Sequence, residues 1–122
     1  MRRLLAMAAA AAAGMAVTPG AGAGETALGV RAEEWNLLLS RSSVSPGPAE
    51  IEYVNEGEDP HDLKIRRRGG QNVRSIAELE PSGIADLKMN LKRDSRYVMW
   101  CSTLDGKHRA LGMEAELRVR KR

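Results

Sequence analysis

The sequence predicts an all-β domain, folded as a β-sandwich. Apolar and polar residues alternate with a period of two in several short segments, and turn-forming residues separate these segments. Alternation of this kind places every second side chain on the buried face of a strand. Short strands divided by regular turns are typical of sandwiches. The chain of 122 residues is long enough for one such domain.

The alternating segments follow one another from residue 34 to the C-terminus. We expect strands at residues 34–40, 49–54, 61–65, 87–91, 97–101 and 115–119. The turns between them are rich in Pro, Gly, Asn or Asp and occupy residues 45–48, 55–57, 69–70, 81–83 and 92–94. Pro46 and Pro48 also argue against a helix in the first of these turns. Residues 75–79 fit either a short helix or another strand, and the pattern does not decide between the two.

The first 23 residues have the pattern of a signal peptide. Arg2 and Arg3 precede an apolar, alanine-rich stretch, and the small residues 21–23 form a cleavage site. The apolar stretch is too short to span a bilayer comfortably. We therefore expect residues 1–23 to be removed and residues 24–122 to form the domain. The mature protein would be exported to the periplasm or the extracellular space, without a membrane span.

The charge of the chain gives little support to nucleic-acid binding. The 19 basic and 16 acidic residues give a net charge of +3, but Arg2 and Arg3 belong to the predicted signal peptide. Without these two, 17 basic residues face 16 acidic ones, and the excess falls to +1. A protein that binds nucleic acid through its phosphates needs a larger and more clustered excess.

Cys101 is the single cysteine of the chain. A lone cysteine in an exported protein forms no intramolecular disulfide, and its thiol is a liability unless it is buried or bound to a metal. His108 follows after six intervening residues, Met113 comes next, and the one other histidine, His61, begins a predicted strand. Two His, one Cys and one Met are the ligand set of a blue-copper site. The sequence thus predicts one copper ion held by His61, Cys101, His108 and Met113.

Other interpretations explain fewer of these residues together. Each of the four, taken alone, fits an ordinary buried or satisfied side chain, but together they form a ligand set. A structural zinc site favours four strong ligands over a thioether. The serines at residues 40–45 have no spare histidine with which to form a nucleophilic triad.

The segments around the four residues resemble the cupredoxin family, of the plastocyanin and azurin type. The resemblance is carried by residues 55–63, 97–101 and 108–113, with residues 113–119 as the final strand. It implies a Greek-key β-sandwich with a type 1 copper site at one end. The implied ligand atoms are His61 Nδ1, Cys101 Sγ, His108 Nδ1 and Met113 Sδ. The spacing between Cys101 and His108 is longer than in plastocyanin or azurin.

The resemblance also implies supporting contacts around the site. The backbone N–H of Asp62 would donate to Cys101 Sγ, and Asn55 would hold the loop before His61. The loop histidine, His108, would lie near the surface and serve as the electron port.

A closed four-ligand site has no open position for a substrate, which favours outer-sphere electron transfer over catalysis. The expected function is therefore one-electron transfer between redox partners, by a monomer that is not an enzyme. Lys107 and Arg109 suggest partners with acidic docking surfaces. Two alternatives stay open: a copper carrier or metallochaperone of the same fold, and a non-metal β-sandwich that serves as an interaction module.

Overall fold

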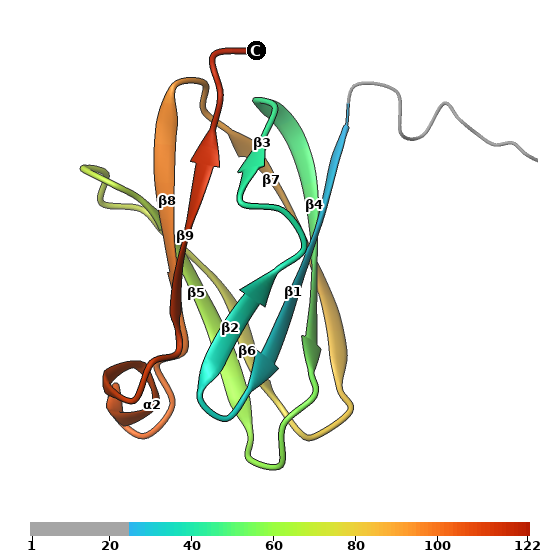
Figure 1. Ribbon diagram of the computed structural model, residues 1–122, viewed down its shortest axis with the longest axis vertical. Helices are drawn as coiled ribbons and strands as arrows, with labels where there is room; N and C mark the ends of the chain where they lie inside the picture. Colours follow the sequence, from blue (N-terminus) through green and yellow to red (C-terminus); the bar gives the residue numbers. More distant parts are fainter. Residues whose placement is uncertain (1–24) are drawn as a thin grey trace, which may run out of the picture.

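A computed structural model describes residues 25–122 of the chain. These residues form a sandwich of two β-sheets (Figure 1). One sheet has the strand order β2-β1-β4-β7 and the other the order β3-β9-β8-β5-β6. The prediction of an all-β Greek-key sandwich is confirmed. The predicted signal peptide, residues 1–23, lies outside the described part of the chain, and so does Gly24.

The first sheet combines a hairpin with two further strands. Its members are β1 (Thr26–Glu33), β2 (Asn36–Leu39), β4 (Gly47–Asn55) and β7 (Ile84–Leu91). β1 is antiparallel to β2 and parallel to β4, and β4 is antiparallel to β7. Every second side chain of β1 and β4 is buried, as a strand with one face on the core requires.

The second sheet contains both segments that lead to the predicted metal ligands. Its members are β3 (Ser43–Val44), β5 (His61–Arg67), β6 (Val73–Leu79), β8 (Ser95–Trp100) and β9 (Glu114–Val119). β8 lies between β9 and β5 and is antiparallel to both. A short helix, α2 (Lys107–Ala110), interrupts the connection from β8 to β9. The core between the sheets is apolar, with Ile51, Tyr53, Leu63, Met99 and Leu117 fully buried.

The structure corrects several predicted boundaries. The expected strand at residues 34–40 is divided, because Glu34 and Trp35 form the turn of the β1–β2 hairpin. β1 and the short β3 were not predicted, although the alternation of β1 is visible in the sequence. The undecided segment at residues 75–79 belongs to strand β6. The connection after Cys101, expected to be a loop, contains α2.

Candidate metal centre

His61 is the first residue of β5, at one end of the sandwich. The pairing of β5 with β6 shifts its register between His61 and Leu63, which marks a β-bulge. A bulge interrupts the strict alternation of side chains and turns neighbouring ones toward the same side. His61, Asp62 and Leu63 are consequently all buried, where a regular strand would expose the middle residue. The imidazole of His61 has no exposed surface.

Cys101 directly follows β8 and lies close to the start of β5. The two strands are antiparallel, with Lys64 paired to Trp100, so the beginning of β5 meets the end of β8. The carboxylate of Asp62 fastens this junction by accepting the backbone N–H of Ser102 at 2.6 Å and its hydroxyl at 2.5 Å. Cys101 has no exposed surface.

His108 is brought back to the site by α2. Leu104, Asp105 and Gly106 adopt positive φ angles of 57°, 54° and 86°, and the chain thereby reverses before the helix begins. Glycine reaches such angles without strain, which suits Gly106 to the position before the helix. The side chain of His108 then points inward, and the residue is 2% exposed.

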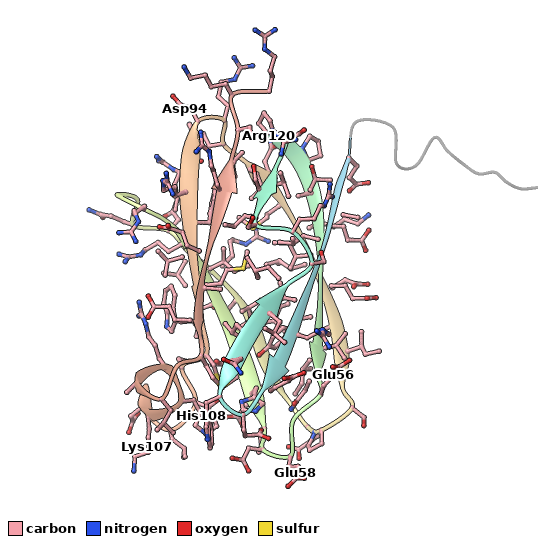
Figure 2. The ribbon with its side chains drawn as sticks, viewed as in Figure 1. Glu56, Glu58, Asp94, Lys107, His108 and Arg120 are labelled. Carbon is pink, nitrogen blue, oxygen red and sulfur yellow. The ribbon has the colours of Figure 1, made fainter. Side chains whose placement is uncertain are left out.

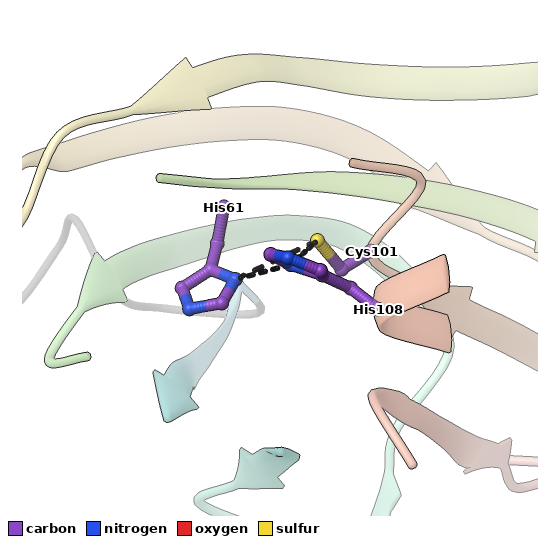
Figure 3. Close-up of side chains that lie close together, drawn as sticks. All are labelled: His61, Cys101 and His108. Atoms are coloured by element: carbon purple, nitrogen blue, oxygen red, sulfur yellow. Dashed lines mark hydrogen bonds between the residues drawn. The ribbon is translucent and has the colours of Figure 1, made fainter. Parts of the chain in front are cut away.

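The three side chains meet at the end of the sandwich (Figure 3). The Nδ1 atoms of His61 and His108 are 3.1 Å apart, and each lies 3.7 Å from Cys101 Sγ. Donor atoms have separations of this size when each lies roughly 2.0–2.3 Å from one shared ion. Two imidazoles and a thiolate are also the donor set of the trigonal plane in blue-copper sites. The residues present therefore fit a copper ion.

Met113 is connected to the same residues through its backbone. Its N–H donates to the carbonyl of His108 at 3.2 Å, and its carbonyl accepts the N–H of Cys101 at 3.1 Å. Its side chain is fully buried. These contacts place Met113 beside two of the candidate ligands, while the role of its thioether as the fourth ligand stays a prediction.

Burial raises the pKa of the Cys101 thiol above its ordinary value. Hydrogen bonding with the Thr103 side chain, the Thr103 backbone and the Asp62 backbone acts in the opposite direction. The bond from the Asp62 N–H to Sγ that the resemblance implies stays a prediction. A bound cation adds a strong further preference for the thiolate, so metal binding releases the thiol proton.

Asn55 holds the loop before His61, as the resemblance implied. Its Nδ2 donates to the carbonyls of Asp59 and Leu79, both at 2.9 Å, and its Oδ1 accepts the N–H of Gly57 at 2.8 Å. The residue is fully buried at the end of β4. With three hydrogen bonds satisfied, its burial carries little penalty, and the loop is fixed relative to the strand.

The turn of the β1–β2 hairpin contributes two residues that sequence reasoning missed. Glu34 Oε2 lies 2.5 Å from His61 Nε2. The Trp35 ring meets the His108 ring edge-on, with centroids 4.8 Å apart, and the His61 ring at 6.4 Å. The sequence offered only a weak signal for these two residues. A single strand was predicted over residues 34–40, so the turn that directs both side chains toward the site was missed.

The resemblance implied that His108 lies near the surface, and the structure leaves 2% of this residue exposed. The exposed residues next to it are Ala110, Leu111 and Gly112, and Leu111 is 53% exposed. Of the two flanking cations, Arg109 is paired with Glu114 at 3.1 Å and 3.2 Å and lies over the Trp100 ring. Lys107 is exposed and makes no ion pair within the described residues.

The fold and the His-Cys-His cluster together define a cupredoxin-like sandwich with a site consistent with type 1 copper. Solved structures support the description of the fold. Reduced auracyanin from Roseiflexus castenholzii aligns with a TM-score of 0.61 and 16% identity, over 77% of this chain and 96% of that one. Auracyanin A from Chloroflexus aurantiacus, described as a "blue" copper protein, aligns with a TM-score of 0.62 and 12% identity, over 79% and 99%.

An enzyme shares the fold as well. Copper nitrite reductase from Nitrosomonas europaea aligns with a TM-score of 0.60 and 11% identity, over 79% of this chain and 41% of that one. Neither a family model nor a curated protein matches the sequence. In the part of the chain that the structure describes, no helix is long and apolar enough to cross a membrane.

Proposed function

We propose that this chain is an exported type 1 copper protein that carries one electron at a time between redox partners. The observation that carries the proposal is the meeting of Cys101 Sγ with the Nδ1 atoms of His61 and His108, 3.1–3.7 Å apart, in a buried cluster. The cluster lies at one end of a sandwich that resembles the auracyanins.

The four proposed ligands are His61, Cys101, His108 and Met113. Copper, when bound, supplies a one-electron couple between Cu(II) and Cu(I). The thiolate and imidazoles suit both oxidation states, and the weak thioether does not strongly favour Cu(II). The surrounding sandwich holds these side chains in one arrangement, so little reorganisation accompanies each electron. A site closed by four protein ligands offers no position for a substrate, and we propose electron transfer without catalysis.

Electrons would enter and leave where the covering of the site is thinnest. Because His108 is buried, Trp35, which is partly exposed and packs on the His108 ring, takes part in this path. The exposed apolar residues Ala110, Leu111 and Gly112 suit brief docking of a partner. Lys107 would attract acidic groups on that partner.

The docking proposal is tested by charge reversal. Lys107→Glu should slow electron transfer to an acidic redox protein and weaken its dependence on salt, because steering by that charge is lost. Arg109→Glu places a carboxylate beside Glu114 and provides a comparison in which an ion pair is broken. Unchanged rates and salt dependence in both variants would contradict the acidic-partner proposal.

The main test is to add one equivalent of Cu(II) to the purified protein lacking residues 1–23. We expect intense thiolate-to-copper charge transfer in the visible range and a narrow copper hyperfine splitting in electron paramagnetic resonance. Cys101→Ala is the control and should give a colourless protein. Stopped-flow mixing of the reduced protein with hexacyanoferrate(III) then measures outer-sphere oxidation. A colourless wild-type protein would overturn the proposal.

The burial of the site favours an electron carrier over a metal carrier. His61, Cys101 and His108 are at most 2% exposed. An acceptor protein that takes over a metal ion must reach its ligands, whereas an electron crosses a layer of side chains. Slow copper release together with fast electron exchange is therefore the expected behaviour. Rapid copper transfer to an acceptor would support the metallochaperone alternative.

Export is proposed from the pattern of residues 1–23. The full-length chain, produced in a bacterium with a periplasm, should appear there without its first 23 residues. The mass of the intact protein in the periplasmic fraction measures this directly. Cytoplasmic protein that retains the N-terminus would contradict the proposal.

A further inference from the structure

The turn of the β1–β2 hairpin places a carboxylate behind one of the candidate copper ligands. Glu34 Oε2 lies 2.5 Å from Nε2 of His61, on the side of the imidazole opposite to the metal-facing Nδ1. An ionised carboxylate only accepts hydrogen bonds, and a neutral imidazole carries one donor and one acceptor nitrogen. Glu34 therefore fixes the proton of His61 on Nε2. The lone pair of Nδ1 is left pointing at Cys101 and His108.

The position of this carboxylate is itself well defined. Its two oxygens accept the backbone N–H of Glu58 at 2.9 Å and 3.1 Å, and Oε2 accepts that of Asp59 at 3.1 Å. A Cβ at Gly57 would lie 2.2 Å from Oε2, so any larger residue at Gly57 would displace the carboxylate. Both oxygens thus accept backbone N–H groups, which a carboxylate without a proton to donate is suited to do.

The same hairpin turn is anchored on the other side of the site. The Trp35 ring packs on His108, and the Trp35 carbonyl lies so near Gly112 that a Cβ there would approach it to 2.7 Å. Glu34 and Trp35 thus tie the turn to both histidines of the cluster. This second anchor limits the movement of Glu34 relative to His61.

We propose that Glu34 is a positioning residue of the copper site, which orients His61 and lowers the reduction potential by stabilising Cu(II) over Cu(I). This inference rests on the proposed copper function. A carboxylate bonded to a ligating imidazole fixes its tautomer and orientation and makes it a stronger donor. A negative charge behind the ligand also favours the more highly charged oxidation state.

The test compares Glu34→Gln with Glu33→Gln in the copper-loaded protein. Both variants remove one negative charge from the hairpin, but the Glu33 carboxylate is paired with Arg31 at 3.6 Å, whereas that of Glu34 contacts His61. In Glu34→Gln we expect the ratio of Cu(I) to Cu(II) affinity to rise at least tenfold. For a one-electron couple this equals an upward shift of about 59 mV in the reduction potential. In Glu33→Gln the ratio should change less than about twofold. Equal potentials in the two variants would overturn the proposal.

A second measurement needs no copper and separates this inference from the proposed function. Nitrogen-15 NMR of the metal-free wild-type protein reports which ring nitrogen of His61 carries the proton. We expect the proton on Nε2 in the wild type and a mixture of both tautomers in Glu34→Ala. A wild-type His61 protonated on Nδ1 would overturn the role of Glu34. A wild-type protein that shows the Nε2 tautomer but gives no blue copper spectrum would instead reject the copper function.

Discussion

The two ends of the sandwich bury different kinds of side chain. At the metal end, which Lys107, His108 and Glu58 mark in Figure 2, the buried polar residues gather. They are Asn55, His61, Asp62, Thr103 and His108. At the opposite end, marked by Asp94 and Arg120, the buried side chains include the apolar Val44, Leu91 and Val119. Thr26, at the start of β1, is the one buried polar residue of that half among those described.

This difference indicates that the two ends of the sandwich have different roles. Buried polar groups cost free energy unless they are hydrogen-bonded, so their gathering at one end requires a matched set of partners. Asn55 makes three hydrogen bonds and Asp62 accepts two from Ser102, which meets this requirement. The opposite end stabilises the sandwich mainly by burial of apolar side chains. Stability and metal binding should therefore respond to substitutions at different ends.

The largest effect should come from the metal itself. Copper at a free concentration ten-thousandfold above its dissociation constant should raise the free energy of unfolding by about 5.5 kcal/mol, because it binds the folded state. Urea unfolding of the wild type with and without Cu(I) measures this gain. Cys101→Ala should show almost none of it. An equal gain in both proteins would place the copper outside the described cluster.

At the apolar end, Leu91→Ala should lower the free energy of unfolding by about 2–5 kcal/mol without altering the copper spectrum. Leu91 is 2% exposed, and its truncation leaves a cavity. Ile84 on the same strand is 61% exposed, so Ile84→Ala is a matched control with a cost of less than about 0.5 kcal/mol. Urea unfolding and electron paramagnetic resonance test the pair. A changed hyperfine splitting in Leu91→Ala would show that the copper site depends on packing at the opposite end.

At the metal end, Asn55→Ala should cost about 2 kcal/mol, since it leaves two partly buried carbonyl groups without donors. It should also speed the loss of copper, because the loop before His61 is no longer fixed. The exposed Asn90 provides the control variant Asn90→Ala. The measurements are urea unfolding and copper transfer to a chelator. Copper loss as slow as in Asn90→Ala would show that Asn55 supports the fold without supporting the site.

The sequence allowed the fold class and the cluster to be predicted because both depend on local patterns. Alternation along residues 49–54 and 97–101 identified strands, and Cys101 followed by His108 identified the ligand loop. The lone cysteine and the two histidines left few other candidates for the site. His61, Cys101 and His108 are indeed the residues that the structure brings together.

The remaining features depend on contacts between distant segments. Glu34 lies 27 residues from His61 in sequence, and no pattern near either residue links the two. The contact of Trp35 with His108 likewise joins two segments that lie far apart in the sequence. The bulge between His61 and Leu63 arises in the pairing of β5 with β6. A single sequence carries such tertiary information too weakly to be recovered from period and composition.

The smallest predicted effect concerns Tyr53, which connects the core to the metal end. Its hydroxyl donates to the carbonyl of Asp62 at 2.8 Å, and Tyr53→Phe should cost about 1 kcal/mol at neutral pH. Burial, reinforced by the nearby charges of Cys101 and Asp62, raises the pKa of Tyr53. Above about pH 10 the unfolded tyrosine loses its proton while the folded one keeps it. The folded state then binds more protons than the unfolded state, so stability falls as the pH rises.

This alkaline loss should amount to at most about 1.4 kcal/mol per pH unit. Tyr53→Phe lacks it, so its stability deficit at pH 7 should shrink and then reverse near pH 11. Urea unfolding of both proteins at pH 7, 9 and 11 measures the difference between their free energies of unfolding. Titration of the other groups is common to both proteins and cancels in this difference. A deficit that stays constant across this range would mean that the Tyr53 hydroxyl ionises as readily in the folded protein as in the unfolded chain.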